Sequence, residues 1–93
     1  MNATELAREL IRIPSLTGQE SEIADYVRGY LEESGFGVEI NAHGSVVAEL
    51  TRRDGPVVLL DAHMDTVDAE ASEWTHPPFA GEIAEGYLYG RGA

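Results

Sequence analysis

The residues best suited to chemistry form one short run, Asp61-Ala62-His63-Met64-Asp65-Thr66, which follows the most apolar stretch of the 93-residue chain. A neutral imidazole nitrogen is a common ligand for a divalent metal ion. His63 and Asp65 are two residues apart, so in extended backbone their side chains project to the same side. A carboxylate placed there can hold the second ring nitrogen of a ligating histidine and thereby fix its tautomer. The run is therefore suitable for a metal ligand at His63 with Asp65 as its support, but it is not sufficient by itself to assign one.

A His-x-Asp triplet alone is weak support for a metal site, because a histidine at the end of a strand often bonds only to the backbone. The other two histidines are weaker candidates. His43 precedes Gly44 in a turn, where its ring is expected to face solvent, and His76 lies in a Thr-His-Pro-Pro sequence that favours a structural or solvent-facing role. The acidic residues between Asp68 and Glu85 are interpreted as a solvated loop.

Amino-acid composition limits which metal ligands and which binding partners are expected. The chain has no cysteine, so histidine nitrogen and carboxylate oxygen are the ligands left for a metal ion. Seventeen acidic and six basic residues give a formal net charge of -11 with no basic cluster, which argues against nucleic acid and an anionic membrane surface as partners. The amino terminus has no signal-peptide pattern and no apolar run is long enough to span a membrane, which predicts a cytoplasmic protein.

Two helices are predicted ahead of the His63 run. Residues 4–12 place their apolar side chains on one helical face, with Asn2 or Thr4 available as the cap. Thr17-Gly18-Gln19-Glu20 fits a capping box, in which the Thr hydroxyl and the Glu carboxylate satisfy backbone donors. It predicts a second helix that begins near its glycine and stops at Ser34-Gly35.

The rest of the chain predicts strands. Residues 38–40 alternate apolar and polar side chains, and residues 45–50 form another extended run, so two adjacent strands are predicted. Residues 81–83 and 87–89 predict a hairpin. Residues 57–60 are continuously apolar, which is typical of a strand buried on both faces of an α/β sheet. Because ligands of open α/β sheets bind at the carboxyl ends of strands, His63 lies where a site is expected.

Three segments in order resemble the M20 family of metallopeptidases and N-acyl-amino-acid deacylases: residues 59–67, Trp74 with Pro78-Phe79, and residues 85–93. Ile13-Pro14-Ser15 also fits the family pattern, so the resemblance covers nearly the whole chain. The family includes acetylornithine deacetylases, desuccinylases, aminoacylases and glutamate carboxypeptidases.

The resemblance implies a fold and a site. The fold is α/β, with helices packed on a mixed, largely parallel sheet, and residues 1–93 are the amino-terminal portion of the catalytic domain. His63 would bind one ion of a two-metal site, and Asp65 would support that ligand and the catalytic carboxylate. The ions would be zinc, with cobalt or manganese as alternatives. The carboxylate that bridges them is expected two positions beyond Ala93, and the paired glutamates and a lid domain that contributes to dimerisation are also expected outside this chain.

The implied function is metal-dependent hydrolysis of an amide bond in N-acyl amino acids or small peptides by the full-length protein, with a homodimer as one assembly. The 93 residues alone are expected to be inactive, and residues 57–60 would then leave an apolar face or edge uncovered. An alternative is a non-catalytic truncated module that mediates protein interaction. In a third reading, His63 and Asp65 hold a structural ion or none.

Overall fold

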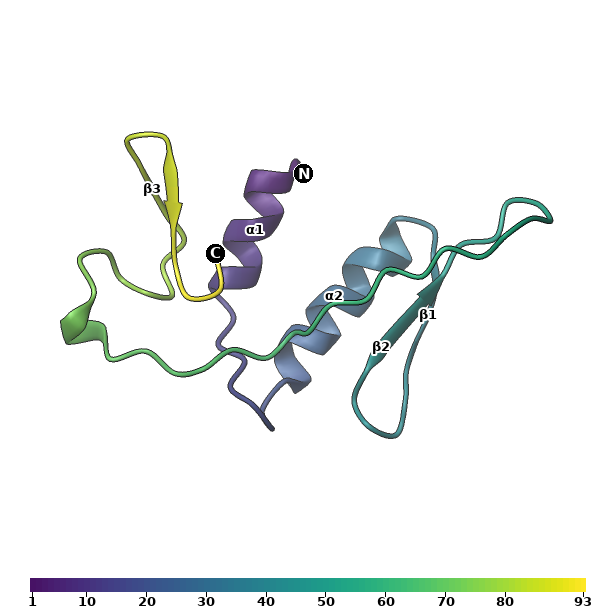
Figure 1. Cartoon of the computed structure of the whole chain (residues 1–93), viewed down its shortest axis with the longest axis horizontal. Helices are drawn as coiled ribbons and strands as arrows, with labels where there is room; N and C mark the ends of the chain where they lie inside the picture. The colour runs from purple at the N-terminus through teal and green to yellow at the C-terminus, as the bar shows by residue number, and fades with distance from the viewer.

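A computed structural model describes all 93 residues, as two helices, two antiparallel hairpins and one short 3-10 turn. In chain order the elements are α1 (Ala3–Ile11), α2 (Ser21–Glu33), β1 (Gly37–Ile40), β2 (Val46–Glu49), η1 (Ala71–Glu73), β3 (Glu82–Ala84) and β4 (Tyr87–Tyr89). Figure 1 shows the β1–β2 hairpin beside α2, and the β3–β4 hairpin on the side of α1. A long extended segment passes from the first hairpin to the second.

Both helices form where the apolar spacing predicts them. The Asn2 side chain accepts a hydrogen bond from the Glu5 backbone N–H at 2.9 Å, and the Glu5 carboxylate accepts one from the Asn2 N–H at 3.0 Å. This reciprocal cap confirms Asn2 as the start of α1. α2 ends at Glu33, directly before the predicted stop, where Gly35 has φ +93°. Neither helix is long and apolar enough to cross a lipid bilayer.

The capping box expected at the start of α2 is wrong. α2 begins at Ser21, and the preceding Glu20 makes no side-chain bond to the helix. The Glu20 carboxylate instead accepts from the Gly18 N–H at 2.7 Å, and the Thr17 hydroxyl donates to Asp65. A tertiary partner has therefore replaced the local one, because a hydrogen bond to a carboxylate is stronger than one to a neutral backbone group.

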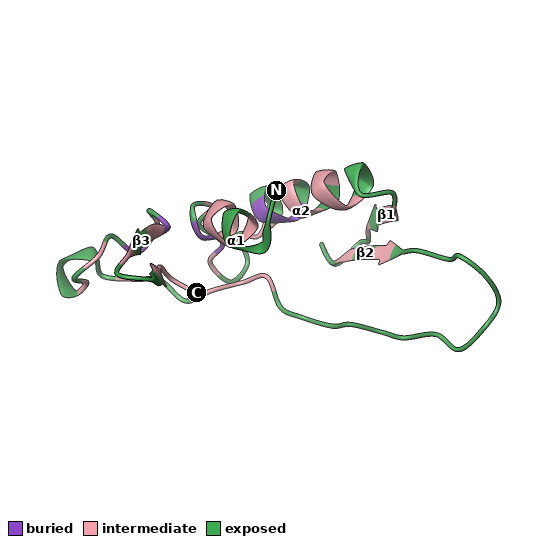
Figure 2. Cartoon of the chain, turned by 90° about the horizontal axis from the view of Figure 1, so that it is seen from above, coloured by how far each residue is buried: buried purple, intermediate pink, exposed green.

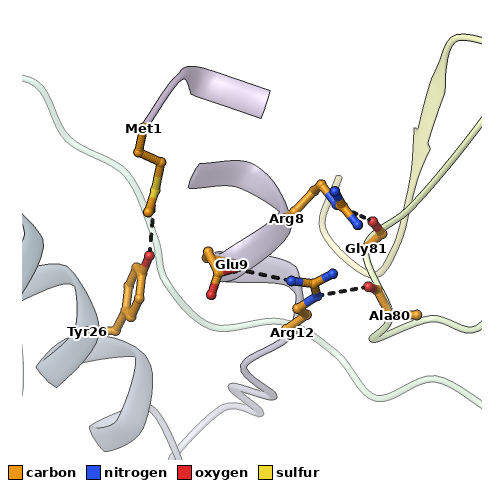
Figure 3. A network of polar contacts seen from close by, with 7 residues as sticks. All are labelled: Met1, Arg8, Glu9, Arg12, Tyr26, Ala80 and Gly81. Carbon is orange, nitrogen blue, oxygen red and sulfur yellow. Dashed lines mark hydrogen bonds and ion pairs between the residues drawn. The ribbon is translucent and has the colours of Figure 1, made fainter. Parts of the chain in front are cut away.

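α1 holds the chain directly before β3 (Figure 3). Arg8 Nε donates to the Gly81 carbonyl at 2.8 Å, and Arg12 Nε donates to the Ala80 carbonyl at 3.1 Å. Glu9 pairs with the Arg12 guanidinium at 3.2 Å and so helps to orient it. Arg8 in α1 and Arg12 directly after it thus contact residues about 70 positions away in the sequence.

The β1–β2 hairpin packs its apolar face towards α2. Val38 pairs with Ala48 and Ile40 pairs with Val46, and all four are partly buried, whereas their neighbours along each strand are exposed. Alternation of this kind is what a sheet with one covered face requires. The two strands predicted here are therefore confirmed.

The prediction that residues 57–60 form a strand buried on both faces is wrong for this structure. Val57, Val58, Leu59 and Leu60 are 93%, 81%, 85% and 90% exposed, and they pair with no strand. Figure 2 shows this segment as a fully exposed arc that swings away from the helices. A buried strand needs neighbouring strands for its backbone groups and helices over its faces, and both hairpins here pair only internally.

The chain is α/β in content, but it forms no largely parallel sheet. Both sheets are antiparallel, and the one parallel contact is an isolated bridge between Leu16 and Thr66. The radius of gyration is 15.2 Å, against about 12 Å for a compact domain of this length. Six of the 93 residues are buried, so the core is small and lies between α1, the start of α2 and the chain before β3.

Candidate functional site

The structure brings His63 and Asp65 together, as their spacing predicts. His63 Nδ1 lies 2.8 Å from the Asp65 backbone carbonyl oxygen and 3.2 Å from Asp65 Oδ1. Because a carbonyl oxygen can only accept a hydrogen bond, Nδ1 must carry the proton, and the lone pair of the neutral ring then lies on Nε2. The His63 side chain is 84% exposed. Nε2 is therefore free to bind a ligand from outside this segment.

Asp65 uses both carboxylate oxygens. Oδ2 accepts a hydrogen bond from the Thr17 hydroxyl at 2.6 Å, while Oδ1 faces the His63 ring. The hydrogen bond from Thr17 lowers the pKa of Asp65 below its ordinary value; partial burial acts in the opposite direction, and the neighbouring His63 lowers it further. Asp65 is thus an anion near neutral pH, which suits an acceptor for the ring N–H.

A loop between the helices holds the His63 run in place. Ser15 is 1% exposed, and its hydroxyl donates to the Met64 carbonyl at 2.8 Å. The Thr66 backbone N–H donates to the Ser15 carbonyl at 2.8 Å, next to the parallel bridge between Leu16 and Thr66. These contacts fix the register of the loop against residues 64–66, and that register places Thr17 opposite Asp65.

We expect Ser15→Ala to destabilise the full-length protein by about 1–2 kcal/mol, because the Met64 carbonyl loses its buried donor. The measurement is thermal unfolding of the purified protein. Ser45→Ala is the matched control, since Ser45 is exposed and its side chain makes no hydrogen bond, and it should change stability by less than about 0.5 kcal/mol. Equal losses in the two variants would contradict the role given to Ser15.

Sequence reasoning did not identify Ser15 and Thr17 as site residues. Ser15 had a signal, because Ile13-Pro14-Ser15 belongs to the resemblance described above. Thr17 had none, since its partner Asp65 is 48 positions away and the local pattern favoured a helix cap.

The other two histidines lie apart from His63. His76 stacks on the Tyr89 ring with centroids 3.7 Å apart, and its Nδ1 lies 3.1 Å from a Glu82 carboxylate oxygen. These contacts give His76 the structural role that its sequence context predicts. His43 lies in the turn between β1 and β2, where its backbone N–H donates to the Asn41 side chain.

The glycine-rich end of the chain lies beside the site. A Cβ built on Gly92 would be 3.2 Å from Thr66 Cγ2, so the backbone there approaches the His63 run closely. Gly92 has φ +84°, a conformation that glycine adopts without strain. Arg91 is anchored next to it: its guanidinium lies 4.9 Å from the centre of the Trp74 ring, and its backbone N–H donates to the Pro78 carbonyl. Two segments about 25 residues apart thus meet at Thr66.

His63 fits the role of one metal ligand, and the chain does not assemble a complete ligand set. Nowhere do three or more His, Cys, Asp or Glu side chains converge. Tight binding of a zinc ion requires about four ligands, of which three or more come from the protein. His63 Nε2 is one nitrogen donor on a ring that Asp65 orients, which is the geometry that a metal-ligating histidine requires.

Comparison with known proteins places this chain among peptidases and desuccinylases by sequence. The family described as peptidase family M20/M25/M40 matches residues 59–93, which include the His63 run and the glycine-rich end. Among similar relatives are proteins named succinyl-diaminopimelate desuccinylase from Methylorubrum populi, Methylobacterium sp. and Hydrogenovibrio crunogenus, which are 42%, 44% and 38% identical to this chain. The alignments cover 95% of this chain and 24–25% of each relative. The chain therefore spans about a quarter of the length of these relatives, and over that length it belongs to the M20/M25/M40 peptidase family.

Proposed function

We propose that the full-length protein hydrolyses the amide bond of an N-acyl amino acid, with N-succinyl-diaminopimelate as the first candidate substrate. The observation that carries the proposal is the His63 ring, whose Nδ1 is bonded to Asp65 and whose Nε2 is left free. Relatives that align with nearly the whole chain are named for removal of a succinyl group from this compound.

We infer that His63 holds one of two divalent ions, with zinc preferred and cobalt or manganese as alternatives. Two such ions, when bound, polarise a scissile carbonyl and lower the pKa of a water molecule. Asp65 keeps the His63 proton on Nδ1, so that Nε2 can bind the ion, and it also supports the catalytic carboxylate. Its anionic state, favoured by the Thr17 hydrogen bond, strengthens this orientation.

In this proposal residues 1–93 are the amino-terminal portion of a catalytic domain, and the remaining ligands, the paired glutamates and a lid domain lie in the rest of the protein. Residues 57–60 would join a largely parallel sheet in the complete domain. These four apolar residues are 81–93% exposed in this chain, and pairing with further strands would bury them. The close approach of Gly92 to Thr66 supports the same arrangement, because it brings the glycine-rich end of the chain beside the His63 run. A homodimer formed through the lid domain is part of the proposal.

The decisive experiment is an assay of the full-length protein with N-succinyl-diaminopimelate. The protein is stripped of metal with a chelator, and release of the primary amine is followed before and after Zn²⁺ or Co²⁺ is added. We expect no turnover without metal, recovery with metal, and at least about tenfold slower hydrolysis of N-acetylornithine, because the two acyl groups differ in size and charge.

The outcomes separate the alternatives. Hydrolysis of N-acetylornithine in preference to the succinyl compound would make the substrate wrong and leave the reaction class intact. An absence of hydrolysis with either compound and either metal would overturn the enzyme proposal and favour the non-catalytic interaction module.

A further inference from the structure

We propose that Thr17 is a positioning residue that orients the Asp65 carboxylate and, through it, keeps the His63 proton on Nδ1. The inference rests on the proposed function, in which His63 is a metal ligand. It assigns a role in that site to a residue from the loop that joins the two helices, 46 positions before His63 in the sequence.

The first step is the contact itself. The Thr17 hydroxyl and Asp65 Oδ2 are 2.6 Å apart, a distance typical of a strong hydrogen bond from a hydroxyl to a carboxylate. The second carboxylate oxygen, Oδ1, lies 3.2 Å from His63 Nδ1. One carboxylate therefore bridges the hydroxyl and the imidazole, and fixing one oxygen directs the other.

The second step is the rigidity of the loop that carries Thr17. Two contacts join Ser15 to the His63 run, one from its buried hydroxyl to Met64 and one between its carbonyl and the Thr66 N–H. On the other side of Thr17 the chain turns sharply, with Gly18 at φ +86° and a bond from the Gln19 N–H to the Leu16 carbonyl at 2.7 Å. Thr17 is thus held on both sides, although its own side chain is exposed.

The third step is the effect of losing the Thr17 hydrogen bond on the orientation of the Asp65 carboxylate. Asp65 is only partly buried, and a carboxylate without a second partner rotates about its last side-chain bond. The Asp65 backbone carbonyl would still hold His63 Nδ1, but the ring would lose its charged acceptor. Loss of such an outer partner weakens metal binding by about 10–100-fold. Because Thr17 acts through Asp65, we expect the low end of that range.

The test uses three variants of the metal-free, full-length protein. Thr17→Val replaces the hydroxyl with a methyl group of similar size, Thr17→Ser keeps the hydroxyl, and Thr51→Val is the matched control, since Thr51 is exposed and its side chain makes no hydrogen bond. Zn²⁺ affinity is measured by calorimetry. The position of the His63 ring proton is read from long-range ¹H–¹⁵N spectra of histidine-labelled protein.

We expect T17V to weaken Zn²⁺ binding by about tenfold and to raise the fraction of His63 rings with the proton on Nε2, because only the neutral Asp65 backbone carbonyl then favours the proton on Nδ1. T17S should stay within about threefold of the wild type, and T51V should match it in both measurements. A loop contact with a purely structural role would change the melting temperature of T17V and leave the ring tautomer unchanged. Wild-type affinity and tautomer in T17V would therefore overturn the proposal.

Two further results keep the test decisive. If T17V does not fold, Thr17→Ala replaces it in the same comparison. A metal-free wild-type ring that carries its proton on Nε2 overturns the proposal without any variant. Absence of Zn²⁺ binding in the wild type would count against the proposed function, whereas the ring spectra of the metal-free proteins would still decide the role of Thr17.

Discussion

Replacing His63 with alanine is expected to lower metal-dependent hydrolysis by the full-length protein at least about a hundredfold, because the loss of a ligand exceeds the 10–100-fold effect of losing an outer partner. The substitution removes Nε2 of His63, which is the free ring nitrogen because Nδ1 already contacts Asp65. The measurements are kcat/KM for N-succinyl-diaminopimelate and the number of zinc ions bound for each polypeptide.

Two further variants, a control histidine and the Asp65 partner, are compared with H63A. His43→Ala removes an exposed histidine from the β1–β2 turn and should leave both measurements unchanged. Asp65→Asn keeps the size of the side chain and removes the charge that faces His63 Nδ1. Its activity should lie between those of H43A and H63A, about 10–100-fold below the wild type. If H63A kept its activity and zinc content, His63 would not be a metal ligand in this protein.

Replacing Gly90 with alanine is expected to destabilise the full-length protein by about 2–3 kcal/mol, through overpacking. A Cβ at Gly90 would lie 2.3 Å from Ile11 Cγ2 and 3.2 Å from its Cδ1, and Ile11 is only 7% exposed. To admit the Cβ, either the buried Ile11 side chain or the backbone at Gly90 must shift. In a domain of 150–250 residues each kcal/mol lowers Tm by about 2–4 °C, which thermal unfolding detects.

Gly29→Ala is the opposing control. Gly29 lies inside α2, and a Cβ there would meet nothing within 4 Å. Alanine should therefore stabilise the helix by about 0.5–1 kcal/mol, because it loses less backbone entropy than glycine on folding. Equal Tm values for G90A and G29A would show that the contact between Gly90 and Ile11 does not constrain the folded protein.

The elements that the sequence determined by itself depend on neighbours along the chain. The Asn2 cap, the two amphipathic helices and both hairpins follow from hydrogen bonds and apolar spacing within a few residues. The proximity of His63 and Asp65 belongs with them, because two residues of extended backbone are enough to place both side chains on one side.

Only the tertiary structure decided what depends on partners distant in the sequence. Thr17 fits a helix cap locally, but it bonds to Asp65 because Ser15 and Leu16 dock beside Thr66. Residues 57–60 read as a buried strand, yet they remain exposed because the chain offers no strand to pair with them. The partner of a hydrogen-bonding group or an apolar surface depends on which residues the fold brings close to it. The spacing of residues along the chain does not contain that information.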